Sequence, residues 1–250
     1  MRVLDLFSGI GGFSLGLERA GMTTVGFCEI EPFPRAVLKK HWPDVPCHDD
    51  ITTRVFTEGE ADVICGGFPC QDISNAGKRA GITGERSGLW RELVRAIRVV
   101  RPKYAIVENV AALLDDGMGV VLGDLAESGY DAEWDCIPAC AVGANHIRDR
   151  TWVVAYAAGG RLESNAASVG VDEEASRDRA LQFARVYPRA VEKVRWWQSE
   201  PDTLRVDDGL PNWAHRIKSL GNAVVPQIPE LIGRAIMQVD QQTKGASDEA

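Results

Sequence analysis

The sequence predicts a doubly wound α/β fold in which one large domain takes up most of the chain. Apolar runs of strand length alternate with helix-like patterns through about the first 155 residues, as in sheets covered by helices on both faces. Glycine-rich or acidic turns follow several of these runs, where open α/β folds place their ligands. The chain has 250 residues, 45% of them hydrophobic and 26% charged, which is ordinary for a soluble globular protein.

The expected strands and helices follow one another in a regular order. Six apolar runs rich in β-branched residues predict strands at residues 3–7, 24–29, 62–66, 104–108, 131–138 and 151–156. Amphipathic patterns predict helices at residues 14–20, 33–41, 89–101, 120–128 and 228–239. A glycine- and alanine-rich break at 157–160 ends the alternating part. We expect residues 1–157 and 216–240 to form one domain, residues 158–215 a short separate region, and residues 241–250 a disordered tail.

Composition and charge restrict the class of protein. The net charge is −8 and the pI about 5.1, which by itself argues against a nucleic-acid partner. Two local stretches are basic, however, at residues 78–101 and 177–197, and these fit a cleft that binds a polyanion. Solvated helix faces are the alternative interpretation. Six cysteines without paired spacing, no signal peptide and no membrane-spanning run lead us to expect a cytoplasmic chain without disulfide or metal.

Cys70 is the candidate nucleophile. It follows a predicted buried strand and the sequence Gly-Gly-Phe68-Pro69, which places a thiol at the carboxyl end of the sheet. A nucleophilic cysteine needs exposure, rigidity and help in forming the thiolate. Pro69 fixes a backbone dihedral beside it. A buried structural cysteine is the alternative reading of such a residue taken alone.

Other candidate site residues follow neighbouring strands. Asp5-Leu-Phe7-Ser8-Gly9-Ile-Gly11-Gly12 forms a strand and a glycine-rich turn before a helix, which lets backbone amides approach a nucleoside. Glu29 follows the next strand and suits the hydroxyls of a ribose. Asp50 and Ile51 suit an adenine amine and ring. These residues predict an adenosine pocket, and without a Gly-Lys-Ser/Thr motif ATP is not expected.

Acidic and basic residues follow the later strands. Glu108-Asn109 closes an apolar strand, so its carboxylate is expected at the same sheet edge as Cys70, where it can act as an acid on a heterocycle. Arg148 and Arg150 lie two residues apart and are expected on one face of an extended segment. Two adjacent guanidinium groups are costly unless they meet an anion or a polar ligand.

These motifs, in this order, resemble those of the DNA cytosine-5 methyltransferases over residues 3–155 and 203–237. The resemblance covers Asp5–Gly12 as a first cofactor motif, Glu29, Asp50-Ile51, Phe68-Pro69-Cys70-Gln71, Glu108-Asn109, Arg148-x-Arg150 and the C-terminal Gly221-Asn222-Ala223. It implies a Rossmann-like S-adenosylmethionine-dependent methyltransferase sheet with a small target-recognition region at 158–215. The implied cofactor residues are Asp5, Phe7, Ser8, Gly9, Gly11, Gly12, Glu29, Ile30, Asp50, Ile51, Phe68, Pro69, Asn222 and Ala223.

The resemblance also implies a mechanism. A cytosine is flipped out of duplex DNA, Cys70 attacks its carbon 6, Glu108 bonds nitrogen 3, and Arg150, with Arg148 beside it, holds the oxygen at carbon 2. Carbon 5 takes the methyl group, and the products are methylated DNA and S-adenosylhomocysteine, without a metal. Candidate DNA contacts are Gln71, Ser74, Lys78, Arg79, Arg185, Arg189, Lys193 and Arg195.

The chain departs from the family in three places. His146 stands where a glutamine is usual, Ile30 where an aromatic residue is common, and the variable region is short, which predicts a short or relaxed target site. A tRNA cytosine methyltransferase, a catalytically silent DNA-binding regulator and a chain that needs a recognition partner stay open as alternatives. The sequence names neither the target site nor a paired restriction endonuclease. A monomer without membrane contact is the default expectation.

Overall fold

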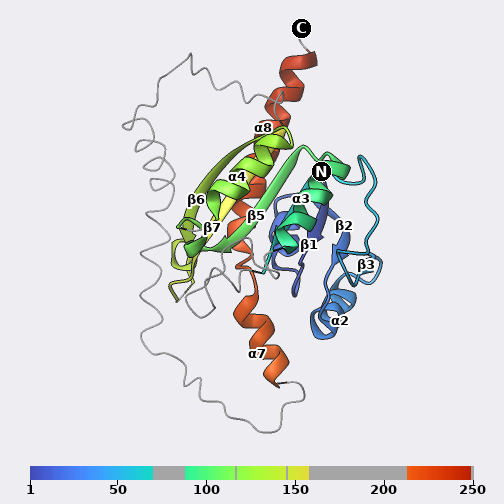
Figure 1. Cartoon of the computed structure of the whole chain (residues 1–250), viewed down its shortest axis with the longest axis vertical. Helices are drawn as coiled ribbons and strands as arrows, with labels where there is room; N and C mark the ends of the chain where they lie inside the picture. Colours follow the sequence, from blue (N-terminus) through green and yellow to red (C-terminus); the bar gives the residue numbers. More distant parts are fainter. Residues whose placement is uncertain (70–87, 116, 145, 158–212, 249–250) are drawn as a thin grey trace.

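The computed structural model describes residues 1–69, 88–115, 117–144, 146–157 and 213–248. These residues form a mixed sheet of seven strands with helices on both faces (Figure 1). The strands stand in the order β3-β2-β1-β4-β5-β7-β6. Their bounds are β1 Arg2–Leu6, β2 Thr23–Cys28, β3 Cys47–His48, β4 Val63–Gly67, β5 Tyr104–Val110, β6 Tyr130–Pro138 and β7 Asp149–Ala157.

The first five strands of this order are parallel, and β7 is antiparallel to both of its neighbours, β5 and β6. The chain therefore leaves β1, β2, β4 and β5 at one common edge of the sheet, and β7 starts at that edge. Residues that follow the parallel strands and residues that begin β7 are thereby brought together.

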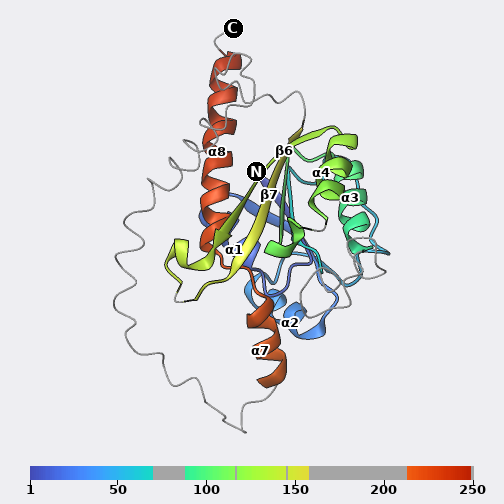
Figure 2. The ribbon, with the colours of Figure 1, turned by 60° about the vertical axis from the view of Figure 1, so that its left-hand side comes forward.

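Two helical layers cover the sheet. Figure 2 shows α1 and α8 on one face and α3 and α4 on the other. The helices are α1 Gly12–Arg19, α2 Pro32–His41, α3 Leu89–Val100, α4 Met118–Glu127, α7 Trp213–Asn222 and α8 Gln227–Asp248, with short 3-10 turns η2 Ala111–Leu113 and η3 Ala139–Val142. Successive side chains of β1 point to opposite faces of the sheet. Val3 packs with α1 and α8, whereas Leu4 and Leu6 pack with α3 and α4.

The predicted fold class is confirmed, and the predicted strands and helices agree with the observed ones to within two residues at nearly every end. Three differences concern short or terminal elements. The two-residue strand β3 was expected only as a strand end, and α7 was not expected as a helix. Helix α8 extends to Asp248, which lies within the tail 241–250 expected to be disordered. Its sequence from Gln241 to Lys244 holds no proline or glycine that would end a helix.

Helices α1 and α8 approach each other so closely that a glycine is needed between them. A Cβ atom on Gly16 of α1 would clash with the carbonyl oxygen of Pro226 and lie 2.7 Å from Cγ of Pro229. The buried residues Ile228, Ile232 and Ile236 of α8 complete the same contact. Gly16 thus sets the distance between the two helices.

Gly16→Ala is expected to lower the free energy of unfolding by about 1–3 kcal/mol, because the added methyl group pushes α8 away from α1. For a chain of this size each kcal/mol lowers the melting temperature by roughly 2–4 °C. Gly123→Ala on α4 is the matched control. Its Cβ would meet nothing within 4 Å, so the better helix propensity of alanine should leave stability equal or raised. Equal melting temperatures for Gly16→Ala and the wild-type chain would contradict this packing argument.

Candidate active site

A cavity of about 480 Å³ opens at the carboxyl edge of the parallel strands. Its wall comes from the segments after β1, β2, β3, β4 and β5, from the start of β7 and from α7. It brings together twelve of the predicted site residues: Phe7, Gly9, Glu29, Ile30, Asp50, Ile51, Phe68, Pro69, Glu108, Arg148, Arg150 and Asn222. Predicted residues that are far apart in the sequence therefore share one cavity.

The glycine-rich turn after β1 shapes one side of the cavity. Phe7 and Gly9 have positive φ angles of 56° and 52°, and both line the wall. Gly11 and Gly12 are not part of the lining. A Cβ on Gly11 would lie 2.7 Å from the ring of Trp42, and one on Gly12 would lie 2.5 Å from the carbonyl oxygen of Val224. Gly11 and Gly12 were predicted as cofactor residues. In the structure their lack of a side chain allows close packing behind the turn.

Asp5 and Ser8 support the same turn from behind the wall. Oδ2 of Asp5 accepts hydrogen bonds from the Ser14 hydroxyl at 2.7 Å and the Ser14 amide at 3.3 Å. The Ser8 hydroxyl donates to the Asp5 carbonyl at 2.7 Å, and the Cys28 amide donates to Ser8 Oγ at 3.2 Å. Complete burial raises the pKa of Asp5 from 3.8 to about 7, although Ser14 opposes the rise. Neither residue lines the cavity, and Ala223 does not line it either.

Glu29 is held by the two loops on either side of it. The Gly9 amide donates to Oε2 at 2.7 Å, and the Glu31 amide donates to Oε1 at 2.8 Å. Only 8% of Glu29 is exposed, yet it lines the cavity. Each carboxylate oxygen thus has one backbone donor and keeps acceptor capacity for a ligand.

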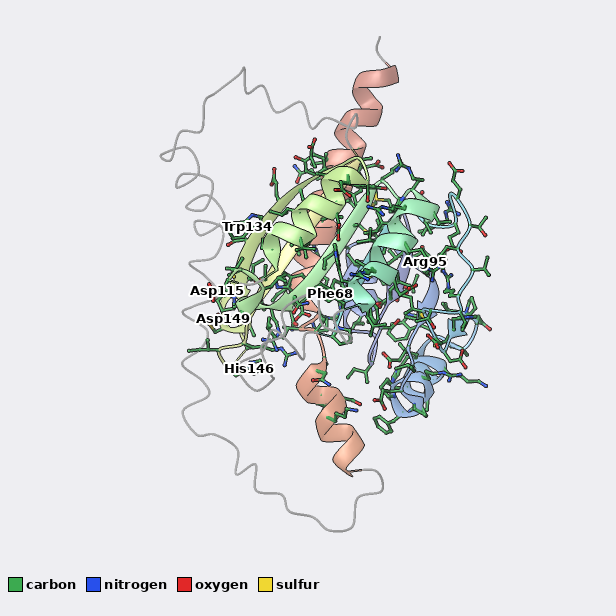
Figure 3. All side chains as sticks on the ribbon, in the orientation of Figure 1. Phe68, Arg95, Asp115, Trp134, His146 and Asp149 are labelled. Carbon is green, nitrogen blue, oxygen red and sulfur yellow. The ribbon has the colours of Figure 1, made fainter. Side chains whose placement is uncertain are left out.

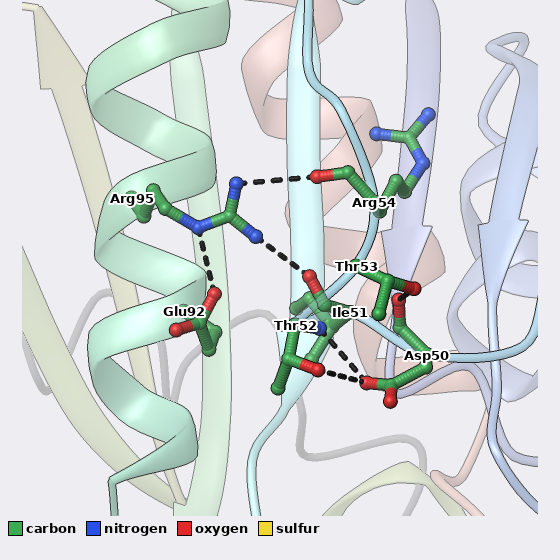
Figure 4. Close-up of polar contacts among 7 residues, drawn as sticks. All are labelled: Asp50, Ile51, Thr52, Thr53, Arg54, Glu92 and Arg95. Carbon is green, nitrogen blue, oxygen red and sulfur yellow. Dashed lines mark hydrogen bonds and ion pairs between the residues drawn. The ribbon is translucent and has the colours of Figure 1, made fainter.

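The segment after β3 supplies Asp50 and Ile51. Figure 4 shows the Thr52 amide and hydroxyl donating to Oδ1 of Asp50, at 2.9 and 2.7 Å. These hydrogen bonds to Thr52 lower the pKa of Asp50 and keep it ionised. The side chain of Ile51 is buried, whereas Ile30 on the opposite loop is 67% exposed. An acidic group and an apolar group therefore lie side by side on this wall.

The backbone before Cys70 is fixed by packing. Phe68 is buried near the centre of the molecule (Figure 3), and its ring centroid lies 5.2 Å from that of Trp90. The side-chain amide of Asn109 donates to the Phe68 carbonyl at 3.2 Å, and the indole Nε1 of Trp90 donates to Oδ2 of Asp124 at 2.7 Å. Cys70 itself lies outside the described residues, as do Gln71, Ser74, Lys78, Arg79, Arg185, Arg189, Lys193 and Arg195.

Glu108 and Arg150 form an ion pair at the cavity wall. Antiparallel pairing sets Val110 opposite Arg150 and Glu108 opposite Trp152, and Nε of Arg150 lies 3.0 Å from Oε1 of Glu108. Burial raises the pKa of Glu108, and the charges of Arg150 and Arg148 oppose that rise. A Cβ on Gly67 would lie 2.8 Å from Oε2 of Glu108, so the neighbouring strand leaves room for the carboxylate.

Arg148 has a different partner. Its Nη1 donates to the carbonyl of Gly221, which ties the start of β7 to the end of α7. Lys218 of α7 donates to Oε1 of Glu31 at 2.8 Å, and Lys218 and Ser219 also line the cavity. Lys218 was not among the site residues predicted from the sequence. Its position four residues before Asn222, one helical turn away, is the signal that could have found it.

The basic stretch 78–101 is only partly free to meet a polyanion. Arg95 donates to the Ile51 carbonyl, Arg98 to the Ser128 hydroxyl and Arg101 to the Ser128 carbonyl. The guanidinium groups of these three residues bind the protein itself, so this part of the basic stretch already has a structural use. Charge counting along the sequence could not distinguish the two uses.

The match to known families decides the classification. A model of the C-5 cytosine-specific DNA methylase family matches residues 1–194. The chain belongs to this family. The family implies the use of S-adenosylmethionine, and the described residues hold no group of three or more side chains able to bind a metal. Among the described helices, none is long and apolar enough to cross a membrane.

Curated relatives of the family are longer than this chain. The Type II methyltransferase M2.BsuMI of Bacillus subtilis (strain 168) is 39% identical over 163 residues, which is 62% of this chain and 42% of that protein. The Type II methyltransferase M.HgiCII of Herpetosiphon aurantiacus is 36% identical over 160 residues, 61% of this chain and 36% of that protein. The chain therefore spans about two fifths of the length of these relatives.

Solved structures show the same fold. A putative DNA modification methyltransferase encoded within a prophage of E. coli has a TM-score of 0.54 at 24% identity, covering 64% of this chain and 47% of that one. The Entamoeba histolytica methyltransferase EhMeth has a TM-score of 0.54 at 20% identity, covering 62% of this chain and 52% of that one. Both structures therefore share the fold described above over nearly two thirds of this chain.

Proposed function

We propose that this chain transfers a methyl group from S-adenosylmethionine to carbon 5 of cytosine in duplex DNA, at a short specific site and through a covalent Cys70 adduct. The observation that carries the proposal is one cavity with two chemically different ends. Glu29, Asp50 and Ile51 line one end, and the partly buried Glu108–Arg150 pair lines the other. A nucleoside cofactor and a flipped-out base would meet in such a cavity.

The acidic end suits a cofactor without phosphate. Glu29 and Asp50 line the cavity beside Glu31 and Asp49, which are paired with Lys218 and Arg35, and the carboxylates of Glu29 and Asp50 would repel a nucleotide phosphate. The same carboxylates suit ribose hydroxyls, an adenine amine and a cationic sulfonium. A volume of about 480 Å³ is also in the range of small-molecule sites. S-adenosylmethionine, when bound, supplies an electrophilic methyl group.

The other end suits cytosine. The Cys70 thiolate adds to carbon 6 and forms a sulfur–carbon bond, which pushes electron density onto carbon 5. Glu108 bonds nitrogen 3, and burial raises its pKa, which increases the fraction of the acid form that can donate there. Arg150 holds the oxygen at carbon 2. Carbon 5 accepts the methyl group, a base removes its proton, and the sulfur–carbon bond breaks to release Cys70.

We further propose the division of labour along the chain. Residues 1–157 with 216–240 form the catalytic and cofactor-binding part, and 158–215 form a short target-recognition region. Arg185, Arg189, Lys193 and Arg195 are its candidate DNA contacts, with Gln71, Ser74, Lys78 and Arg79 on the nucleophile side. So short a region supplies few base contacts, which fits a short or relaxed site.

The test is methyl transfer by the purified chain alone. The chain is incubated with methyl-labelled S-adenosylmethionine and, separately, mixed-sequence duplex DNA or tRNA, and modified cytosines are mapped by bisulfite sequencing. We expect label in DNA, at cytosines that share one short context. Label in tRNA alone would indicate the tRNA methyltransferase. Binding of DNA and cofactor without transfer would overturn the autonomous enzyme in favour of a silent regulator or a chain that needs a partner.

A further inference from the structure

Arg95 of α3 uses all three of its guanidinium nitrogens inside the protein. Figure 4 shows Nη2 donating to the Ile51 carbonyl at 2.6 Å, Nη1 to the Arg54 carbonyl at 3.2 Å, and Nε to Oε2 of Glu92 at 2.7 Å. Glu92 lies one turn earlier on α3 and holds the guanidinium group in place. The other two nitrogens clamp two carbonyls that are three residues apart on the same segment.

A buried aromatic ring completes this clamp. The guanidinium carbon of Arg95 lies 4.9 Å from the centroid of Phe56, and that of Arg54 lies 4.5 Å from it. Arg54 is in turn paired with Glu60 at 2.9 Å. Phe56 is buried and belongs to the same hydrophobic cluster as Ile51, Leu93 and Ile97. The contacts at Ile51, Arg54 and Phe56 therefore tie the whole segment from Asp50 onwards to α3.

The clamped segment has little other support from the sheet. Strand β3 consists of Cys47 and His48 only and pairs with β2 alone, so the ladder ends before Asp50. Two carbonyls of the segment depend instead on Arg95. Ile51 is the decisive residue, because its carbonyl binds Arg95 while the residue itself lines the cavity next to Asp50. A shift of this carbonyl would move the cavity wall.

We propose that Arg95 is a positioning residue for the adenosine end of the cavity: it sets where Asp50 and Ile51 stand and thereby sets cofactor affinity. The inference rests on the proposed function, because it takes the ligand at this wall to be S-adenosylmethionine or its product. It also replaces a role in DNA binding for this side chain. In Figure 3, Arg95 lies on the opposite side of the molecule from His146, which comes just before the arginine motif, and from Asp149, which stands between its two arginines.

The experiment compares Arg95→Lys and Arg95→Ala with Arg98→Ala in the full chain. Arg98 lies on the same helix but binds Ser128 and Glu127, so its loss should leave the segment intact. We expect S-adenosylhomocysteine to bind about 10- to 100-fold more weakly to Arg95→Ala, because two charge-assisted hydrogen bonds are lost. Arg95→Lys should be weakened about 5-fold or more, since an ammonium cannot span both carbonyls. Arg98→Ala should stay within about twofold.

Two further measurements separate positioning from general structural support. KM for the cofactor should rise while kcat at saturating cofactor and the Kd for duplex DNA stay within about twofold. Asp50→Asn and Arg95→Lys should also be non-additive in the Kd for S-adenosylhomocysteine, since both act through the same wall. Additive effects would mean that Arg95 does not act through Asp50 and Ile51.

The outcomes distinguish failure of this inference from failure of the proposed function. A wild-type chain that does not bind S-adenosylhomocysteine would overturn both. If the wild-type chain and Arg95→Lys bind S-adenosylhomocysteine equally well, only the inference is overturned. The inference would also be overturned if the Arg95 variants bound DNA more weakly while their cofactor binding was unchanged. That result would indicate that Arg95 contacts DNA. If Arg95→Ala does not fold, Arg95→Lys and the double variant Asp50→Asn with Arg95→Lys still test the inference.

Discussion

Glu108→Gln should lower the rate of methyl transfer to DNA by about 10²- to 10³-fold while S-adenosylhomocysteine binding stays within about twofold. The substitution keeps the shape of the side chain but removes the ionisable carboxyl group, which pairs with Arg150 3.0 Å away and which can donate a proton to nitrogen 3 of the base once it is protonated. Glu29 and Asp50, at the other end of the cavity, are unchanged. The loss should therefore fall on kcat, as expected for an interaction made in the transition state.

Two control variants set the lower and upper limits of the rate. Cys70→Ser in the same assay defines complete loss of the covalent route. Glu133→Gln on the edge strand β6, an exposed glutamate that does not line the cavity, should leave the rate unchanged. The measurement is label incorporated into duplex DNA under single-turnover conditions, alongside calorimetric binding of S-adenosylhomocysteine. A Glu108→Gln rate within threefold of the wild-type rate would remove Glu108 from the chemistry.

Asp5 should make the chain less stable as the pH rises from about 4 to about 7. Burial raises the pKa of this carboxyl from 3.8 to about 7, so the folded chain holds the proton more tightly than the unfolded chain. The stabilising contribution is complete below pH 3.8 and is lost as the pH rises to the folded-state value. Between pH 5 and pH 8 the wild-type chain should lose about 2–3 kcal/mol of unfolding free energy through Asp5 alone.

Asp5→Asn isolates this effect. The asparagine oxygen can still accept the hydrogen bond from Ser14, and the side chain no longer titrates. Urea denaturation of both chains at pH 5, 6, 7 and 8 gives the difference in unfolding free energy at each value. The difference should shift in favour of Asp5→Asn as the pH rises. A difference that is constant across this range, or that moves in the opposite direction, would show that Asp5 is ionised in the folded chain at pH 5.

The parts of the fold that repeat a local pattern could be predicted from the sequence. Apolar runs such as 63–66 and 104–108 are long enough to give both the strand and its place in a buried sheet. Strand β3 could not be predicted in the same way, because two residues carry no periodicity and pair only once β2 is in place. Helix α7 was not predicted, because its region stands out in the sequence by charge and aromatic residues more than by helical spacing.

In the candidate site, too, some features could be predicted from the sequence and others could not. Glu29, Asp50 and Glu108 could be predicted to share a cavity, because each follows a parallel strand and those ends meet at one edge. The supporting contacts could not be predicted. Arg95 reaches Ile51 across 44 positions of sequence, and Gly11 faces Trp42 only after α2 has packed. Such contacts depend on tertiary packing, which leaves no local pattern in the chain.

The contact between α1 and α8 also has a consequence for how the chain is made. At typical rates of translation the ribosome needs about 10–40 s to proceed from Arg19 to Gln227. Throughout that interval Phe13 and Leu17 of the nascent chain lack the isoleucines of α8 that later bury them. The sheet can assemble meanwhile, but one of its faces is covered by α1 without α8 and leaves apolar side chains exposed. Newly made chains should therefore depend on a chaperone up to the moment at which α8 leaves the exit tunnel.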